Sequence, residues 1–269
     1  MQSIRLSQRT LSSPLPSVHD GIDICSPELG NIISYPEFSA EEYSRRLDEI
    51  CSFGITHFLP AGRTRIGKMI IAGKGCVSIV LKVRAKGKKI CALKIRRTDA
   101  NRPSMNREAH LHGIANCAGV GPFLFQSSEN IITMEFIDGL SIVNWVEKHD
   151  DAAADEVTNL AVSILEQCYR LDTARIDHGQ LSCINHHIIV SSKSNKNIAN
   201  IVDFESSSTQ RKPSNVTAAA QSLFLGGSIS NQMKQLIQLP QREKIIELLK
   251  TYKSNPNRIN FDNIVGMLR

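Results

Sequence analysis

The sequence lacks several features that would place it in a specialised class of protein. No apolar run approaches the roughly 18–20 residues of a membrane span, which argues against a membrane protein. The first residues, MQSIRLSQRTLSSPLPS, contain no apolar stretch of the kind found in secretory signals. The seven cysteines are scattered and include no C-x-x-C pair, which favours reduced thiols over a disulfide framework or a zinc finger. We therefore expect a cytoplasmic protein without membrane contact.

The composition is typical of a folded globular protein. The 269 residues suffice for one large domain or two small lobes, and 41% of them are hydrophobic. The net charge of +6 is unevenly spread, because ten basic residues and a single acid, Asp99, lie in residues 82–107. This segment is a candidate contact with RNA or the ribosome. A solvated strand-and-loop surface is the simpler interpretation.

Two segments precede the strand-rich part of the chain. Residues 1–38 contain four prolines, many serines and no sustained period, which indicates an extended or loosely ordered N-terminal segment. Residues 39–66 are interpreted as an N-terminal helical extension. Ser39 is a candidate N-cap, and Glu42 follows it at the spacing of a capping box.

The rest of the chain divides into a strand-rich and a helix-rich part. Residues 67–138 predict strands near 67–72, 77–84 and 89–96, then a short helix after Pro103 and two further short strands. Residues 139–269 are mainly helical, with a long amphipathic helix over residues 155–172 and two strands after it. The predicted fold class is α+β, with a small antiparallel sheet that carries one helix and a compact, mainly helical lobe.

Two features of the strand-rich part suggest a phosphate site. The turn Gly73-Lys74-Gly75 separates two predicted strands, and glycines let backbone amides approach phosphate oxygens closely. A simple hairpin turn is the alternative. Lys94 lies in the otherwise apolar strand CALKI and needs an acceptor, which Glu108 on the next helix can supply. A lysine on an edge strand, facing water, is the alternative.

Two features of the helix-rich part suggest a metal site. Asn185 and Asp203 each lie beside a predicted strand, and their side-chain oxygens suit Mg²⁺. A turn former and a cap are the alternatives for these residues. A nearby group of possible zinc ligands has no established ligand spacing; it consists of His178, Cys183, His186 and His187.

In chain order, these landmarks resemble the protein-kinase-like fold between about residues 68 and 227. The chain is similar to small archaeal predicted serine/threonine kinases, to RIO kinases and to the kinase subunit of the tRNA-modifying KEOPS complex. GKGCVSIV resembles the glycine-rich loop, TMEFIDG the segment between the lobes, HGQLSCIN the catalytic loop, and VDFES the strand end that binds metal.

The resemblance implies ATP and Mg²⁺ as cofactors and a serine or threonine of a protein as the substrate. It implies catalytic roles for Lys94, Gln180 and Asp203, and metal binding by Asn185 and Asp203. The residues that it places around ATP are Gly73, Gly75, Val80, Ala92, Lys94, Glu108, Met134, Glu135 and Ile137.

The chain departs from the kinase pattern at two positions. Gln180 replaces the catalytic aspartate; an amide cannot take a proton, although it can still orient a hydroxyl. Asp177 could substitute if the loop turned it inward. Glu205 replaces the glycine of the usual Asp-Phe-Gly, and the segment after it is short. A slow kinase is therefore predicted, with a nucleotide-binding pseudokinase or an RNA-associated kinase-like ATPase as alternatives.

Overall fold

The computed structural model describes residues 21–149, 153–194, 196–226 and 228–269. It has a mixed α+β fold with antiparallel sheets, as the sequence predicts. The main sheet has the strand order β1-β2-β6-β7-β9-β8, with β5 paired to β6 off this path. Its strands are β1 (Ile22–Asp23), β2 (Ile55–Leu59), β5 (Gly73–Lys74), β6 (Ser78–Ala85), β7 (Ile90–Arg96), β8 (Leu124–Ser127) and β9 (Ile131–Glu135).

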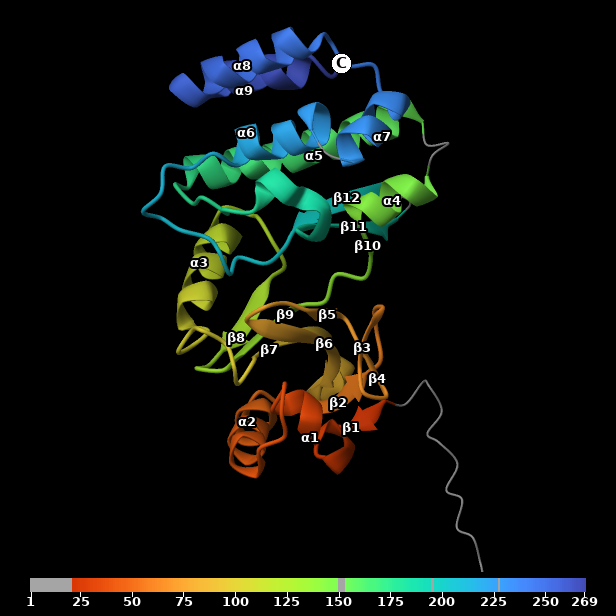
Figure 1. The fold of residues 1–269 in the computed structure, drawn as a ribbon, viewed down its shortest axis with the longest axis vertical. Coiled ribbons are helices and arrows are strands. Elements are labelled where there is room, and N and C mark those ends of the chain that lie inside the picture. The colour runs from red at the N-terminus through yellow and green to blue at the C-terminus, as the bar shows by residue number, and fades with distance from the viewer. Residues whose placement is uncertain (1–20, 150–152, 195, 227) are drawn as a thin grey trace, which may run out of the picture.

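Two smaller sheets complete the strands of the described residues. One pairs β3 (Thr64–Ile66) with β4 (Met69–Ile71). The other has the order β10-β11-β12 and consists of β10 (Leu140–Ser141), β11 (Ile188–Lys193) and β12 (Lys196–Ile201). The second of these sheets lies among the helices, away from the main sheet (Figure 1).

The helices fall into two groups along the long axis of the molecule (Figure 1). Helices α1 (Gly30–Ile33), α2 (Ala40–Ser52) and α3 (Asn106–Cys117) lie near the main sheet. The others gather at the opposite end; they are α4 (Ile142–Lys148), α5 (Ala154–Thr173), α6 (Asn215–Ala220), α7 (Ser228–Leu236), α8 (Arg242–Ser254) and α9 (Arg258–Gly266). Short helical turns are η1 (Pro27–Leu29), η2 (Lys86–Lys88), η3 (Leu181–His186) and the π-turn η4 (Gln221–Leu225). Among the described residues, no helix has the length and apolar character needed to cross a membrane.

Buried hydrophobic side chains form two large cores. The first, here called the sheet core, lies between one face of the main sheet and helices α1 and α2. The second, the helical core, surrounds α5 and includes side chains from β11, β12 and helices α4 to α9. The buried face of α5 contains the residues that its sequence period predicts, Val157, Leu160, Ala161, Ile164, Leu165 and Cys168, and also Gln167 and Leu171. A small cluster of Met105, Ala109 and Ile132 lies where α3 meets the sheet.

The segment before α2 is more ordered than its sequence suggests. Residues 1–20 lie outside the described part of the chain. Residues 21–38, predicted to be extended or loosely ordered, instead contain β1, η1 and α1, with Leu29, Ile32 and Ile33 buried in the sheet core. Apolar residues at helical spacing sit between the prolines here, and burial of each contributes about 1.5–3 kcal/mol. The prediction was therefore wrong for residues 21–38.

The segment 39–66 is only partly the helical extension that was predicted. Helix α2 begins after Ser39, whose hydroxyl accepts a hydrogen bond from the Glu42 amide at 3.3 Å, so the predicted N-cap is confirmed. The remainder forms β2, a central strand of the main sheet, and then β3. The apolar residues of strand β2 (ITHFL) do not alternate with polar ones, and the strand is recognised by its pairing with β6. The sheet thus includes residues well before residue 67.

Candidate functional site

The Lys94 cluster, which consists of Lys94, Glu108 and Asp203, joins three distant segments. The Lys94 ammonium on β7 lies 2.5 Å from Glu108 Oε1 on α3 and 2.7 Å from Asp203 Oδ1, just after β12. Lys94 and Glu108 are almost fully buried, whereas the side chain of Asp203 is 36% exposed. The acceptor predicted for Lys94 is therefore present, and the cluster opens to solvent on the Asp203 side.

Burial and charge act in opposite directions within this cluster. Burial disfavours the charged form of Lys94, but the carboxylates of Glu108 and Asp203 outweigh it and raise the pKa of Lys94 above its ordinary value. Burial raises the pKa of Glu108, and Lys94 opposes this shift. For Asp203, burial is outweighed by Lys94, so its pKa is lowered. Asp203 is therefore ionised at neutral pH and available to a cation.

The alternation of the strands places four of the predicted nucleotide residues, Val80, Ala92, Lys94 and Met134, on one face of the main sheet. Lys94 pairs with Val80 on β6, and Ala92 pairs with Met134 on β9. Directly opposed residues, and residues two apart on a strand, share a face. The other face carries the side chains of the sheet core, against α1 and α2. Val80, Ala92 and Met134 therefore share the face from which Lys94 reaches Glu108 and Asp203.

The predicted glycine turn lies at the end of the same face. Gly73 pairs with Val80, and the Gly75 amide donates a hydrogen bond to the carbonyl of Ser78 at 2.8 Å. A Cβ atom at Gly73 or Gly75 would make only ordinary contacts, the nearest at 3.9 and 3.5 Å. The structure therefore leaves space at both glycines, and no contact among the described residues requires glycine there.

The segment after β9 contains the last of the predicted nucleotide residues. The Glu135 amide donates to the Phe123 carbonyl at 2.8 Å, so this amide is already engaged within the chain. Lys82 lies 3.3 Å from Asp138 and stacks over the ring of Phe136 at 4.5 Å. The side chain of Ile137 is half-buried. Lys82 thus holds this segment against β6.

The ring of Phe204 connects α3 to the loop that precedes η3. It stacks on His112 with ring centroids 4.9 Å apart, and its centroid lies 5.4 Å from that of His178. Gly121 is required here: its φ is +85°, and a Cβ atom would lie 2.6 Å from the Phe204 ring. Burial lowers the pKa of both histidines to about 4, so both rings are neutral at neutral pH. This stack fixes the residue next to Asp203.

Three arginines hold the segment that follows Phe204. Arg102, Arg211 and Arg107 donate hydrogen bonds of 2.5, 2.6 and 2.8 Å to the successive carbonyls of residues 205–207. Asp203 itself has a φ of +72°, which is uncommon for a residue other than glycine. The arginines and the Phe204 stack together maintain this conformation and aim Asp203 at Lys94.

Gln180 lies at the start of η3 and is half-buried. Its Oε1 atom is buried without a hydrogen-bond partner among the described residues. The neighbouring Gly179 has a φ of +86°, and a Cβ atom there would lie 2.4 Å from the Arg211 guanidinium. The carboxylate of Asp177 lies 2.7 Å from the Arg211 guanidinium. Asp177 is therefore engaged in an ion pair.

Asp203, Asn185 and His187 are the candidate ligands of a divalent cation, and of the two others it is His187 that lies beside Asp203. Asp203 offers a carboxylate and Asn185 an amide oxygen, and the Asn185 side chain has no hydrogen bond within the described residues. His187 Nδ1 is buried without a hydrogen-bond partner and lies 3.9 Å from Asp203 Oδ2. Burial lowers the pKa of His187, and Asp203 opposes this shift. Within the described ranges, no group of three or more His, Cys, Asp and Glu side chains is arranged to hold a metal ion.

The basic segment 82–107 is largely engaged within the chain. Among its ten basic residues, those that donate to acceptors of the same chain include Lys82, Lys94, Arg96, Arg97, Arg102 and Arg107. Lys89 lies over the ring of Phe125 at 3.4 Å. Lys86, Lys88 and Lys89, at the turn between β6 and β7, are exposed to solvent. The RNA contact stays a prediction.

The sequence reasoning missed several residues that shape the site. His112 lies four residues after Glu108, so the helical spacing placed it on the same face of α3. His187 follows Asn185 by two residues and was considered only as a zinc ligand. Arg102 and Arg107 donate to carbonyls that lie 103 and 100 residues further along the chain. A local sequence pattern does not predict contacts at such separations.

We compared the sequence with protein-family models and with curated proteins. No protein-family model matches the chain. No curated protein matches it either. The functional argument therefore rests on the residues and geometry described above.

Proposed function

We propose that this chain is an ATP- and Mg²⁺-dependent kinase that transfers the γ-phosphate to a serine or threonine hydroxyl of a protein. The observation that carries the proposal is the contact of the buried Lys94 ammonium with both Glu108 and Asp203. A strand lysine, a helix glutamate and an aspartate after a later strand are the parts that position phosphates and metal in protein kinases. Their convergence from distant positions supports the same use here.

Lys94 and the sheet face around it account for nucleotide binding. In the proposal, Lys94 donates to the α- and β-phosphates, and Glu108 keeps its ammonium in place. Val80, Ala92 and Met134 supply an apolar surface on the same face for the adenine ring. Gly73 and Gly75 leave room for phosphate, and the backbone of residues 135–137 borders the base.

Asp203 and Asn185 are the proposed holders of Mg²⁺. Held by these two residues, Mg²⁺ would supply positive charge that offsets the negative charge of the transferred phosphoryl group. Asp203 keeps its carboxylate ionised beside Lys94, and Asn185 adds a neutral oxygen without a competing hydrogen bond. The Phe204 stack and the arginines keep Asp203 in place throughout.

The expected rate of phosphate transfer depends on Gln180. In the transfer, the hydroxyl oxygen forms a bond to the γ-phosphorus, the bond to the ADP oxygen breaks, and the hydroxyl proton leaves to solvent. Gln180 Oε1 is free to accept a hydrogen bond from the hydroxyl and orient it, but it does not take the proton. Asp177 is held by Arg211 and cannot replace it. Because positioning carries most of this chemistry, we expect slow rather than absent transfer.

A two-lobe arrangement is part of the proposal. The sheet core and the helical core are separate clusters, and the Lys94 cluster draws on elements that border both. In this interpretation, residues 67–138 with the preceding β1, β2 and α2 form the smaller lobe. Residues 139–269 form the larger one.

A nucleotide-binding pseudokinase is the second candidate. The pairing of Asp177 with Arg211 favours it specifically, because the loop then offers no carboxylate to the substrate hydroxyl. In this case the chain binds ATP at the same residues without transferring phosphate.

The deciding experiment follows transfer of the γ-phosphate from labelled ATP with Mg²⁺. Wild type, Asp203→Ala and Gln180→Asp are compared on a general protein acceptor and for autophosphorylation. We expect slow transfer by wild type, none by Asp203→Ala and faster transfer by Gln180→Asp. Saturable ATP binding without transfer in any of the three would support the pseudokinase. Full activity of a folded Asp203→Ala would refute both candidates.

A further inference from the structure

His187 occupies an unusual place beside the Lys94 cluster. Its side chain is buried, and its Nδ1 atom, which has no hydrogen-bond partner, faces Asp203 Oδ2 at 3.9 Å. The two oxygens of Asp203 therefore have different neighbours, because Lys94 contacts Oδ1 at 2.7 Å. A buried ring nitrogen without a hydrogen bond, close to a partly exposed carboxylate oxygen, can offer its lone pair to a cation when it carries no proton.

The backbone fixes His187 in this position. Its amide donates to the carbonyl of Ile184 at 2.9 Å, and its own carbonyl accepts from the Val202 amide at 2.9 Å. The second bond ties His187 to the residue just before Asp203. The relative position of the imidazole and the carboxylate is thus set by the pairing of the β11 and β12 ends, and not by a mobile loop.

The neighbouring histidines have different environments. His186 is exposed to solvent. His178 is buried, and its Nε2 atom lies 3.2 Å from the Val202 carbonyl, with its ring edge-on to that of His187. His187 is thus the member of this group whose nitrogen faces Asp203, and His186 is a natural control for it.

We propose that His187 is a further ligand of the divalent cation at Asp203 and Asn185, and that it shifts the metal preference of this chain from Mg²⁺ toward Mn²⁺. The proposal rests on the proposed function, because that function assigns the cation to Asp203 and Asn185. Mg²⁺ prefers a shell of oxygens, whereas an imidazole nitrogen coordinates first-row transition ions well. Mn²⁺ accepts carboxylate and amide oxygens together with that nitrogen.

The separation of the two donors is compatible with a shared ion. Metal–nitrogen and metal–oxygen bonds to such ions are about 2.0–2.2 Å, so two ligands of one ion lie at most about 4.3 Å apart. The 3.9 Å between His187 Nδ1 and Asp203 Oδ2 is within this limit. It is also longer than a hydrogen bond, so the two groups do not satisfy each other directly.

The test measures metal binding without nucleotide and without turnover. The full-length protein is titrated with Mn²⁺, and free Mn²⁺ is followed by its electron paramagnetic resonance signal; Mg²⁺ affinity is obtained by competition. Wild type is compared with His187→Leu, His186→Ala and Asp203→Ala. His187→Gln is included in case His187→Leu does not fold, as judged by circular dichroism and thermal unfolding.

We expect His187→Leu to weaken Mn²⁺ binding about tenfold or more, by analogy with losses on removing groups that support metal ligands. Mg²⁺ binding should change less than about twofold, His186→Ala should alter neither, and Asp203→Ala should abolish both. An equal loss of both metals in a folded His187→Leu protein would mean that His187 only supports the structure, which overturns the proposal. Unchanged Mn²⁺ affinity in that variant, or no Mn²⁺ binding by wild type at millimolar concentration, would also overturn it.

These outcomes are distinct from failure of the proposed function. A wild-type protein that binds Mn²⁺ through His187 but transfers no phosphate would retain this inference and lose the kinase activity. A protein that transfers phosphate, with a metal selectivity that His187→Leu leaves unchanged, would retain the activity and lose this inference.

Discussion

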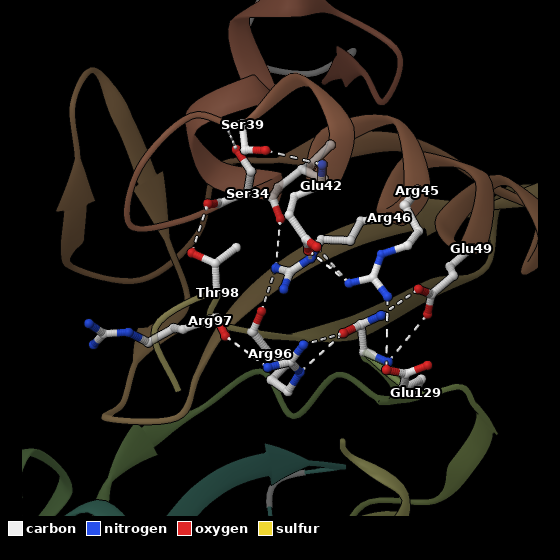
Figure 2. A network of polar contacts seen from close by, with 12 residues as sticks. Ser34, Ser39, Glu42, Arg45, Arg46, Glu49, Arg96, Arg97, Thr98 and Glu129 are labelled. Atoms are coloured by element: carbon white, nitrogen blue, oxygen red, sulfur yellow. Dashed lines mark hydrogen bonds and ion pairs between the residues drawn. The ribbon is translucent and has the colours of Figure 1, made fainter. Parts of the chain in front are cut away.

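Two buried cations, Lys94 and Arg46, have opposite roles in this molecule. Arg46 on α2 lies 3.0 Å from Glu42 on its own helix and donates to the carbonyls of Ile33 and Arg96 (Figure 2). Lys94 contacts two carboxylates from distant segments, one of them partly exposed. Both side chains are removed from water, but only the Lys94 cluster is open to a ligand.

The pKa values of Arg46 and Lys94 shift in opposite directions, which reflects the different acceptors of the two side chains. Burial lowers the pKa of Arg46, and Glu42 compensates for it only in part, because the other acceptors of Arg46 are uncharged carbonyls. The two carboxylates outweigh burial at Lys94 and raise its pKa. The Arg46 network fastens α2 and the residues before it to the end of β7. The Lys94 cluster sets two carboxyl groups against one ammonium, which suits a site for a divalent cation.

The sharpest test of the comparison is removal of Lys94. In Lys94→Met we expect phosphate transfer to fall about 100-fold or more, the scale on which loss of one positioned donor lowers a rate. The fold should persist, because Glu108 can take a proton once its partner is absent and Asp203 reaches solvent. The measurement is the initial rate of γ-phosphate transfer, with thermal unfolding as the control. If Lys94→Met destabilised the fold as much as we expect for Arg46→Met, Lys94 and Arg46 would not differ in role.

Removal of Arg46 should produce the converse result. Arg46→Met leaves the Ile33 and Arg96 carbonyls and Glu42 without their buried donor, which costs about 3–5 kcal/mol of unfolding free energy. Denaturant unfolding measures this loss.

Arg45→Met is the matched control for Arg46. The Arg45 side chain is 42% exposed, and its ion pairs with Glu42 and Glu129 lie at the surface. This variant should lose less than about 1 kcal/mol. Similar losses of unfolding free energy in Arg45→Met and Arg46→Met would show that the buried contacts of Arg46 stabilise the fold no more than the surface ion pairs of Arg45.

The sequence predicted Lys94 but not Arg46, and the reason is local context. A lysine inside CALKI stands out among apolar neighbours, whereas Arg46 in YSRRLDE looks like an ordinary surface residue of an amphipathic helix. Its burial depends on residues 21–38 and on the end of β7 packing around it. Neither of these long-range contacts is visible in a local pattern.

The same distinction holds for the fold and the site. Periodic elements such as β6, β7 and α5 were predicted correctly because their own apolar pattern determines them. The strand β2 was missed because its partner β6 defines it. The order of the kinase-like motifs along the chain identified Lys94, Glu108 and Asp203 as candidate site residues. It did not reveal the pairing of Asp177 with Arg211, which bears directly on the expected rate.

Acid pH should weaken the two regions unequally. His112 and His178 flank Phe204 in the native state with pKa values of about 4, below the 6.5 of an unfolded histidine. Between pH 6.5 and 4 the unfolded chain therefore binds more protons than the native one. The stability from these two residues is fully present above about pH 6.5 and is lost as the pH falls through this window, by at most about 1.4 kcal/mol per pH unit for each histidine.

The region around Phe204 should therefore open before the Arg46 network. No histidine is among the labelled charged residues of that network, which are Glu42, Arg45, Arg46, Glu49, Arg96, Arg97 and Glu129 (Figure 2). Amide hydrogen exchange at pH 7 and pH 5 measures this: protection should fall in α3 and in residues 203–208 and persist in α2.

The variant His112→Gln keeps a donor for the Pro122 carbonyl, but its side chain does not titrate. It should flatten the pH dependence of unfolding relative to wild type. An equally steep dependence in that variant would mean that other groups carry the acid sensitivity, and the two regions would then not be distinguished by pH.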